Sequence, residues 1–141
     1  MTTHKRLVLA LQPDMLAICR LEPTAHISED ILNGNFVAIT KTNEELSIIC
    51  PQDNIPEEVI YTKGWRCLRI EGPFSHDTSG ILASVLTPLA NAHLSVFTTT
   101  TFDTGHILIK EENLNHAIQL LTQTGHVIRS ENKVTVPYAI Q

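Results

Sequence analysis

The chain is poor in positive charge and has no long apolar run. Its 141 residues include 10 Lys and Arg against 15 Asp and Glu, which gives a formal net charge of −5. A nucleic acid is therefore excluded as the main partner, because nucleic-acid binding needs a surplus of cations to neutralise phosphates. No apolar run approaches the roughly 20 residues of a membrane span. The sequence thus predicts neither a nucleic-acid partner nor a membrane partner.

Cysteine is scarce as well, and no CxxC pair occurs. Cys19, Cys50 and Cys67 are odd in number and lie in apolar, strand-like contexts. We expect them to be buried free thiols in a reducing cytosol. The apolar stretch near the N-terminus is broken by Gln12 and Pro13 and has no small-residue cleavage site. We therefore expect no signal peptide and a cytoplasmic protein.

Motifs for metal, phosphate and catalytic chemistry are missing too. No H-x₃-H spacing occurs and no GxGxxG, and no Lys-Ser or Lys-Thr follows a glycine. We therefore expect no metal and no other cofactor. His76 and Asp77 are adjacent, but no nucleophile motif accompanies them, so an enzyme has no supporting constellation. The histidines are spread along the chain: His4, His26, His76, His93, His106, His116 and His126.

The informative stretch runs from Gly72 to Lys110 and contains a polar cluster, a helix and a Thr-rich strand. Ser79 is the expected N-cap, since its hydroxyl can accept from a free N–H of the first turn. Those first N–H groups and the helix dipole favour an anion. Gly80 has no side chain, so a carboxylate can approach the backbone closely. The helix is predicted from an apolar stripe at helical spacing, Ile81, Leu82, Val85, Leu86 and Leu89.

The second half of the chain predicts one complete βαββαβ unit over residues 65–129. Phe102, which follows the Thr-rich strand, is expected in the core. Gly125 is expected as the C′ residue of the second helix. After the first strand and the helix from Gly80, the expected elements are strands at 94–101 and 106–110, a helix at 113–124 and a strand at 126–129. The first strand is expected at 66–71 and alternates, with Leu68 and Ile70 on one face.

The first half predicts strands but no long amphipathic helix. A tight turn is expected at Asn43-Glu44, between two β-branched runs. Lys63-Gly64 is the expected boundary, with a fresh strand beginning at Trp65. The predicted domains are therefore residues 1–63 and 64–141. Within the first, strands are expected at 7–11, 15–21, 36–40 and 46–50, a short helix at 27–32 and a helical turn at 57–61.

The segment GILASVLTPLANAHLSVFTTTTFDTGHILIK resembles the ACT domain, a small ligand-binding module of regulatory proteins. More narrowly it is similar to tandem ACT proteins of the group of cytosolic arginine sensors of the TOR pathway. The first half resembles the same group through FVAITKTNEELSIICP and GWRCLRIEGPF. The resemblance covers most of residues 7–127. It implies an α+β fold of two tandem ferredoxin-like domains, with antiparallel sheets and helices on one face, the first domain being degenerate.

The resemblance also implies a ligand site shared between domains. In the similar sensors, the Ser-Val pair at Ser84 and Val85 contributes from the partner ACT domain. This chain matches only half of those four-domain proteins, so we expect a homodimer that rebuilds the arrangement. The sensors have acidic side chains at the positions of Thr78 and Gly105, which read the guanidinium. Because both are absent here, we expect arginine and lysine to bind poorly.

Pro88 lies inside the predicted helix and cannot donate to the carbonyl of Ser84. Two interpretations stay open at this point. One is a simple bend or early end of the helix. The other is that Ser84 keeps polar groups free for a ligand or a partner chain.

The function that we predict is regulatory recognition of an amino acid or a similar small metabolite. The ligand carboxylate is expected at the N–H groups of Gly80, Ile81 and Leu82. Carbonyls or hydroxyls near Thr101 and Phe102 hold the ammonium. The ligand side chain is read by Thr78 and by the turn from Asp103 to Gly105. The alternative is a protein–protein interaction module whose ligand site is vestigial.

Overall fold

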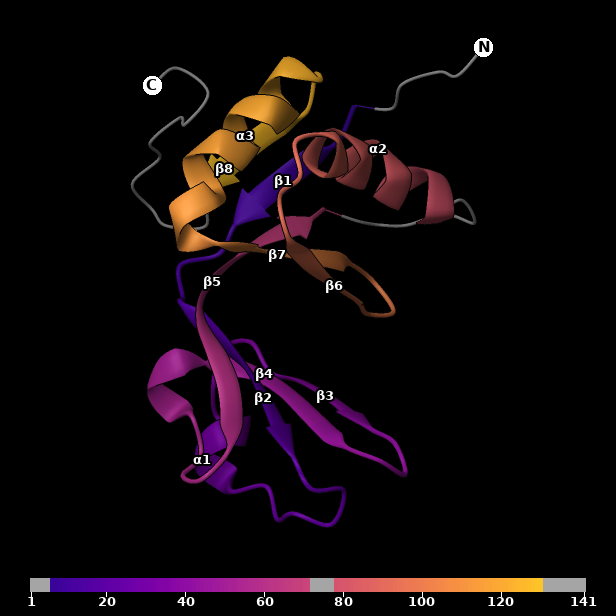
Figure 1. Ribbon diagram of the computed structural model, residues 1–141. Helices are drawn as coiled ribbons and strands as arrows, with labels where there is room; N and C mark the ends of the chain where they lie inside the picture. Colours follow the sequence, from indigo (N-terminus) through magenta and orange to yellow (C-terminus); the bar gives the residue numbers. More distant parts are fainter. Residues whose placement is uncertain (1–5, 72–77, 131–141) are drawn as a thin grey trace. The chain divides into compact units, whose positions relative to one another are not determined.

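A computed structural model describes residues 6–71 and 78–130 of the chain. It divides the chain into two compact units (Figure 1). The N-terminal unit is Asp14–Trp65, and the C-terminal unit combines Met1–Pro13 with Arg66–Gln141. Within the described ranges, no helix has the length and apolarity needed to cross a membrane.

The N-terminal unit is a four-stranded antiparallel sheet with little helix. Its strands lie in the order β3-β4-β2-β5, which is the order of a ferredoxin-like βαββαβ fold in which both helices are short. The expected α+β fold is therefore confirmed for the first half as well. The strands are β2 (Leu16–Leu21), β3 (Ala38–Lys41), β4 (Leu46–Pro51) and the first part of β5 (Ile60–Ile70); the helical segments are α1 (Glu29–Leu32) and the 3₁₀ turn η1 (Gln52–Asn54).

The core of the N-terminal unit lies on one face of this sheet. Alternate residues of a strand point to the same face, and β2 and β4 therefore contribute every second residue. Ile31 of α1 is buried against them. The strand residues of this core form three opposed pairs, Ala17 with Cys50, Cys19 with Ile48 and Leu21 with Leu46.

The turn between β3 and β4 is held by one hydroxyl. Thr42 Oγ1 accepts from the N–H groups of Glu44 and Glu45, at 3.1 Å each. The two strands pair antiparallel, with Ile39 opposite Ile48. The hairpin that the sequence predicted around Asn43-Glu44 is thus confirmed.

The C-terminal unit has five strands and two full helices. The chain order from β5 onward, β5-α2-β6-β7-α3-β8, confirms the predicted βαββαβ pattern. Its further elements are β1 (Val8–Leu11), α2 (Thr78–Asn91), β6 (Val96–Thr100), β7 (Gly105–Lys110), the 3₁₀ turn η2 (Glu111–Asn113), α3 (Leu114–Gln123) and β8 (Val127–Ser130).

Strand β1 is added to this pattern from the start of the chain. It pairs antiparallel with β5, where Leu9 lies opposite Ile70, and parallel with β8, where Leu9 lies opposite Ile128. The strand order is therefore β8-β1-β5-β7-β6. The sequence predicted a linear division into residues 1–63 and 64–141, whereas the structure groups β1 with the C-terminal half.

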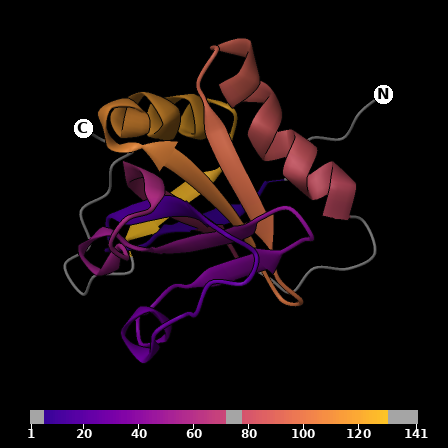
Figure 2. The ribbon, with the colours of Figure 1, turned by 60° about the horizontal axis from the view of Figure 1, so that its bottom comes forward.

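Both α2 and α3 cover the same face of the C-terminal sheet (Figure 2). The core between helices and sheet takes one apolar stripe from each helix. α3 is predicted well because its stripe and its Gly125 terminator are both clear in the sequence. The fully buried side chains of this core are Leu9, Leu68, Ile70, Val85, Leu89, Ile107, Ile109, Ala117 and Leu121.

Strand β5 runs without a break through the expected boundary. Gly64 lies inside it with a φ of +84°, a conformation that glycine adopts without strain. Its N–H donates to Gln52 Oε1 at 2.9 Å. The prediction that a new strand begins at Trp65 is wrong, as is the helical turn at 57–61, because Ile60 and Tyr61 already belong to β5. A glycine in the middle of the run was interpreted as a break, although β pairing on both sides carries the strand across it.

The three cysteines are buried and form no disulfide with one another, as expected. Burial raises the pKa of the Cys67 thiol to about 12, although nearby Arg69 opposes the rise. Cys67 is therefore a protonated, unreactive thiol at neutral pH.

Candidate functional site

The first turn of α2 is the centre of the predicted site. The helix begins at Thr78, so Ser79 lies inside the first turn and is not the N-cap; the helix starts two residues earlier than the predicted start at Gly80. Ser75, His76 and Asp77, the polar cluster before the helix, lie outside the described residues. The side chains of Thr78 and Ser79 are likewise not described. Gly80 is exposed at the surface.

The next residues of α2 turn their side chains inward. Ile81 is buried and Leu82 half-buried in the C-terminal core. Because α2 begins at Thr78, the N–H groups of Ile81 and Leu82 lie in the second turn and bond within the helix, so the expectation that they are free for a carboxylate is wrong; Gly80 N–H is the one of the three that belongs to the free first turn. Val85 is fully buried in the same core. Its side chain packs within its own unit.

Ser84 has both of its polar groups engaged. Its hydroxyl donates to the carbonyl of Ile81 at 2.8 Å. Its carbonyl, which Pro88 cannot satisfy, lies 3.1 Å from Nε2 of His126. The helix continues to Asn91, so Pro88 does not end it early, and the carbonyl of Ser84 is not free. Sequence reasoning did not find His126: the proline signals a missing donor but does not say which residue replaces it.

The turn between β6 and β7 forms the other half of the predicted site. Thr101 N–H donates to the carbonyl of Thr104 at 2.8 Å, and Thr104 N–H donates to Thr101 Oγ1 at 3.0 Å. Asp103 is exposed and Gly105 is buried at the start of β7. Phe102 is 100% exposed, so its expected core position is wrong. Hydrogen bonds between Thr101 and Thr104 close the turn, and the two residues between them, Phe102 and Asp103, are exposed.

Figures 1 and 2 both show this turn and the first turn of α2 at the same end of the C-terminal unit. The structure therefore brings exposed Gly80 and the exposed residues Thr101, Phe102 and Asp103 to one end of one unit. The expectation that a second chain contributes Ser84 and Val85 is not tested by a single chain.

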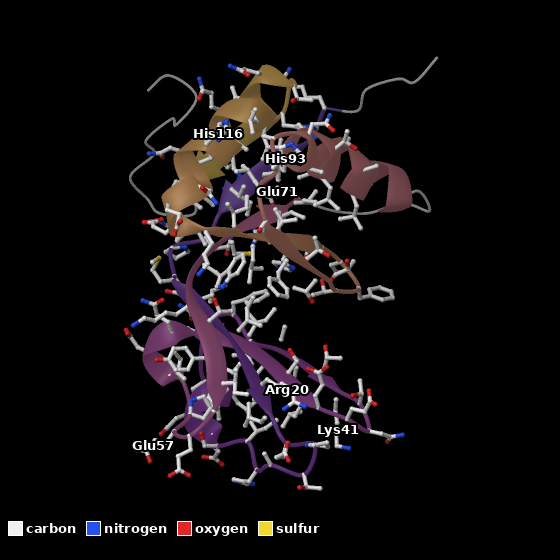
Figure 3. The ribbon with its side chains drawn as sticks, in the orientation of Figure 1. Arg20, Lys41, Glu57, Glu71, His93 and His116 are labelled. Carbon is white, nitrogen blue, oxygen red and sulfur yellow. The ribbon has the colours of Figure 1, made fainter. Side chains whose placement is uncertain are left out.

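Both long helices of the C-terminal unit end in a Schellman motif. In α3, Gly125 N–H donates to Thr122 O and His126 N–H to Leu121 O, at 3.0 Å each, with Gly125 at a φ of +106°. In α2, Leu94 N–H bonds the carbonyl of Leu89. There the left-handed residue is His93, with a φ of +62°; it is labelled in Figure 3. The α3 motif is what places His126 next to α2.

A cluster of one carboxylate and two arginines lies on β5 and β8 of this unit: Arg69 is in β5, Glu71 follows β5, and Arg129 is in β8. Arg69 and Arg129 both lie opposite Ala10 of β1, one from each side. Glu71, labelled in Figure 3, accepts from Arg69 at 3.1 Å and also from Arg129. Burial alone would raise the pKa of Glu71, but the hydrogen bonds from the two arginines outweigh it and hold the pKa below its ordinary value.

His106 is a buried histidine beside the predicted site. It lies on β7 next to Gly105 and is 6% exposed. Burial holds its pKa below the ordinary value, and the nearby charge of Arg69 acts in the same direction, while a hydrogen bond that the ring donates to the backbone of Thr99 opposes them. His106 is therefore a neutral group at pH 7. Within residues 6–71 and 78–130, no group of three His, Cys, Asp or Glu side chains is placed to hold a metal ion.

Two family models match the chain. Residues 60–123 match the model described as the ACT domain, and residues 14–58 match one described as an N-terminal domain. The second match falls within the N-terminal unit of the structure, Asp14–Trp65. The fold and these matches define a tandem α+β protein of the ferredoxin-like class. The chain contains an ACT domain at residues 60–123.

Among solved structures, the chain is similar over most of its length to a protein of Agobacterium tumefaciens, with 36% identity and a TM-score of 0.84, covering 91% of this chain and 96% of that one. The regulatory subunit of aspartate kinase from Thermus thermophilus has a TM-score of 0.59 at 13% identity, covering 86% of this chain and 99% of that one. At that identity the likeness concerns the fold alone.

A curated relative is the cytosolic arginine sensor for mTORC1 subunit 1 of Homo sapiens. It is 33% identical over 94 residues, which cover 61% of this chain and 29% of that protein. The matching region thus spans less than a third of the length of the curated relative.

Proposed function

We propose that this chain is a regulatory module that binds an amino acid or a similar small metabolite at the first turn of α2. The observation that carries the proposal is that exposed Gly80 and the exposed turn between β6 and β7 share one end of the C-terminal unit. A relative that is named an arginine sensor supports an amino acid as the ligand.

In this proposal the ligand carboxylate accepts from free N–H groups of the first turn of α2, among them Gly80. Because the helix begins at Thr78, Gly80 N–H has no partner within the helix, whereas the expected donors Ile81 and Leu82 fall in the second turn, where N–H groups are bonded inside the helix. The helix dipole favours a negative charge at this end, and the first turn itself holds no Asp or Glu. Gly80 leaves room for an oxygen to reach the backbone.

The other groups of the ligand face the turn between β6 and β7. Carbonyls of Thr101 and Phe102 hold the ammonium, while Thr78 and the segment Asp103–Gly105 read the side chain. The hydroxyl of Thr101 already bonds within the turn, which favours its carbonyl over its hydroxyl as the ligand group. Ser84 of a second chain completes the site in a homodimer with isologous contacts.

Specificity for a small neutral amino acid follows from the absence of acidic groups at Thr78 and Gly105. A guanidinium without a carboxylate partner would cost several kcal/mol in a closed site. The proposed ligand is therefore not arginine, in contrast to the ligand in the printed name of the human relative. Asp103 is the exposed acidic residue nearest along the chain to Gly105.

A panel of the twenty amino acids in a thermal-shift assay tests the proposal. A ligand that binds only the folded state raises the melting temperature by mass action. We expect a rise with one or more small neutral amino acids and none with arginine or lysine. Light scattering is expected to give the mass of a dimer. If no amino acid changes the melting temperature, the ligand proposal is wrong.

The second candidate is a protein–protein interaction module with a vestigial site. The full exposure of Phe102 supports it, since an aromatic ring at a turn tip is a common contact residue. Either candidate is a regulatory, non-catalytic role in the cytosol, which the names of the relatives support. Catalytic turnover of any substrate would contradict both.

A further inference from the structure

Helix α2 lacks one of its own hydrogen bonds. In an α-helix the carbonyl of residue 84 accepts from the N–H of residue 88, but residue 88 is proline and has no N–H. Ser84 is half-buried, and a buried carbonyl without a donor is costly. A donor from outside the helix must therefore replace the missing one.

That donor is the ring of His126. Nε2 lies 3.1 Å from the carbonyl of Ser84, and Nδ1 accepts from the N–H of Leu7 at 3.1 Å. A ring nitrogen that accepts carries no proton, so the proton of the neutral ring is on Nε2, where it can be donated to Ser84. This tautomer serves both neighbours at once.

Two backbone hydrogen bonds and burial of the side chain fix the position of the ring. The Schellman motif that ends α3 holds the backbone of His126, whose N–H bonds Leu121 O at 3.0 Å. The next residue, Val127, donates to the carbonyl of Leu7 at 2.9 Å. The side chain itself is 2% exposed. Leu7 is thus bonded by two successive residues of the α3–β8 junction.

We propose that His126 is a positioning residue, which supplies the donor that Pro88 removes from α2 and so ties the helix of the ligand site to Leu7, the residue before strand β1. Ser84 follows Gly80 by four residues, about one turn or ~6 Å along the axis. A shift of α2 at Ser84 therefore moves the N–H groups of Gly80 to Leu82. The consequence for ligand binding rests on the proposed function, but the bond between His126 and Ser84 does not.

A double-mutant cycle tests the bond without any ligand. His126→Leu is expected to raise the unfolding equilibrium constant about tenfold or more in the native background, the usual effect of leaving a buried partner unsatisfied. With Pro88→Ala also present, residue 88 can donate to Ser84, and the effect of His126→Leu is expected to shrink several-fold. Equal effects in both backgrounds would show that the ring does not replace the donor missing at Ser84.

Two further variants separate bonding from volume. His126→Gln keeps an acceptor for Leu7 and a donor for Ser84, so we expect it to recover most of the stability lost in His126→Leu. His116→Leu is the matched control, since His116 is an exposed histidine on α3, and we expect no measurable change. A His126→Gln variant no more stable than His126→Leu would contradict the proposal.

The unmodified protein offers a test that needs no folded variant. The ¹⁵N chemical shifts of His126 are expected to report the Nε2–H tautomer, with Nδ1 unprotonated. A ring protonated on Nδ1 in the folded protein would overturn the proposal whatever the variants do.

Amide hydrogen exchange and the amino-acid panel then test the positioning. His126→Leu is expected to speed exchange at Leu7 and at Gly80 to Leu82, and to abolish or reduce any thermal shift, whereas His126→Gln preserves both. Unchanged exchange at Gly80 to Leu82 in a folded His126→Leu variant would show that the ring does not position the site. If the unmodified protein responds to no amino acid, the proposed function is wrong, and exchange and the cycle still decide the role of His126.

Discussion

The βαββαβ strands of the two units have the same order except that β1 is inserted between β5 and β8 in the C-terminal unit, and the units differ in helix content and in charge. The N-terminal unit has α1 of 4 residues and a 3₁₀ turn, whereas the C-terminal unit has helices of 14 and 10 residues. Residues 14–65 hold nine acidic against three basic residues, and the rest of the chain holds six against seven. The sheet therefore persists without long helices, but a site at a helix N-terminus needs one. Only the C-terminal unit meets that requirement.

The largest expected effect comes from truncating a leucine to alanine on one helix of each unit. Leu89 of α2 is fully buried between helix and sheet. Leu89→Ala is expected to lower the free energy of unfolding by about 3 kcal/mol, from lost burial and a residual cavity. Leu32→Ala on α1, where the side chain is 52% exposed, is expected to cost less than about 0.5 kcal/mol. Urea unfolding followed by circular dichroism measures both.

Ligand binding should depend on the opening of α2 alone. Gly80→Val is expected to weaken amino-acid binding at least about tenfold by blocking the approach to the backbone, with the fold retained. Ala83→Val, at an exposed position of the same helix, is the control and should bind as the unmodified protein does. Calorimetry gives the affinities and circular dichroism the fold. A folded Gly80→Val variant with unchanged affinity would place the site elsewhere.

The C-terminal unit also contains the charged cluster of Glu71, Arg69 and Arg129. This cluster makes the stability of the unit depend on pH. Because the folded pKa of Glu71 is lowered, the cluster stabilises the fold above the ordinary carboxyl pKa and loses this effect as pH falls through the folded value. Glu71→Gln should lower the free energy of unfolding by about 0.5–1 kcal/mol at pH 7, since Arg129 is half exposed and solvent screens the pair.

The difference between Glu71→Gln and the unmodified protein should disappear in strong acid, where Glu71 is protonated. Denaturant unfolding at a series of pH values measures it. Glu112→Gln, an exposed carboxylate of η2, is the control and should show no such dependence. A Glu71→Gln effect that persists at low pH would assign the stabilisation to packing.

The smallest expected effect compares the two helix ends within the C-terminal unit. His93 adopts the left-handed conformation that Gly125 adopts in the other helix. For a residue with a side chain this costs about 1–2 kcal/mol, while glycine adds about 0.5–1 kcal/mol of unfolded-state entropy. His93→Gly should therefore stabilise the protein by about 0.5 kcal/mol, seen as a higher urea midpoint. A lower midpoint would show that the His93 side chain makes a stabilising contact.

The sequence predicted the C-terminal unit well because its signals are local. The stripe of α3, its Gly125 terminator and the strands on either side each depend on a few neighbouring residues. The hairpin of the N-terminal unit was predicted for the same reason. The position of β1 was not, since a strand pattern says nothing about pairing with residues more than 100 positions away.

The candidate site was predicted only as a location. The helix opening and the turn between β6 and β7 are local patterns, and both were found. Phe102 was placed wrongly because an apolar residue after a strand is usually core, whereas here the Thr101–Thr104 hydrogen bonds end the strand and turn it outward. Val85 follows the apolar stripe, and its burial could have been read from that stripe.

The parallel pairing of β1 with β8 has a consequence for synthesis. A ribosome delivers β1 first and β8 more than 100 residues later, so the C-terminal sheet cannot close until nearly the whole described chain has emerged. Residues 14–65 pair only among themselves within their unit and can fold in the meantime. Contacts of such long sequence separation also slow folding. The N-terminal unit can therefore be folded while β1, whose last three residues are buried in the finished sheet, still lacks its partner β8.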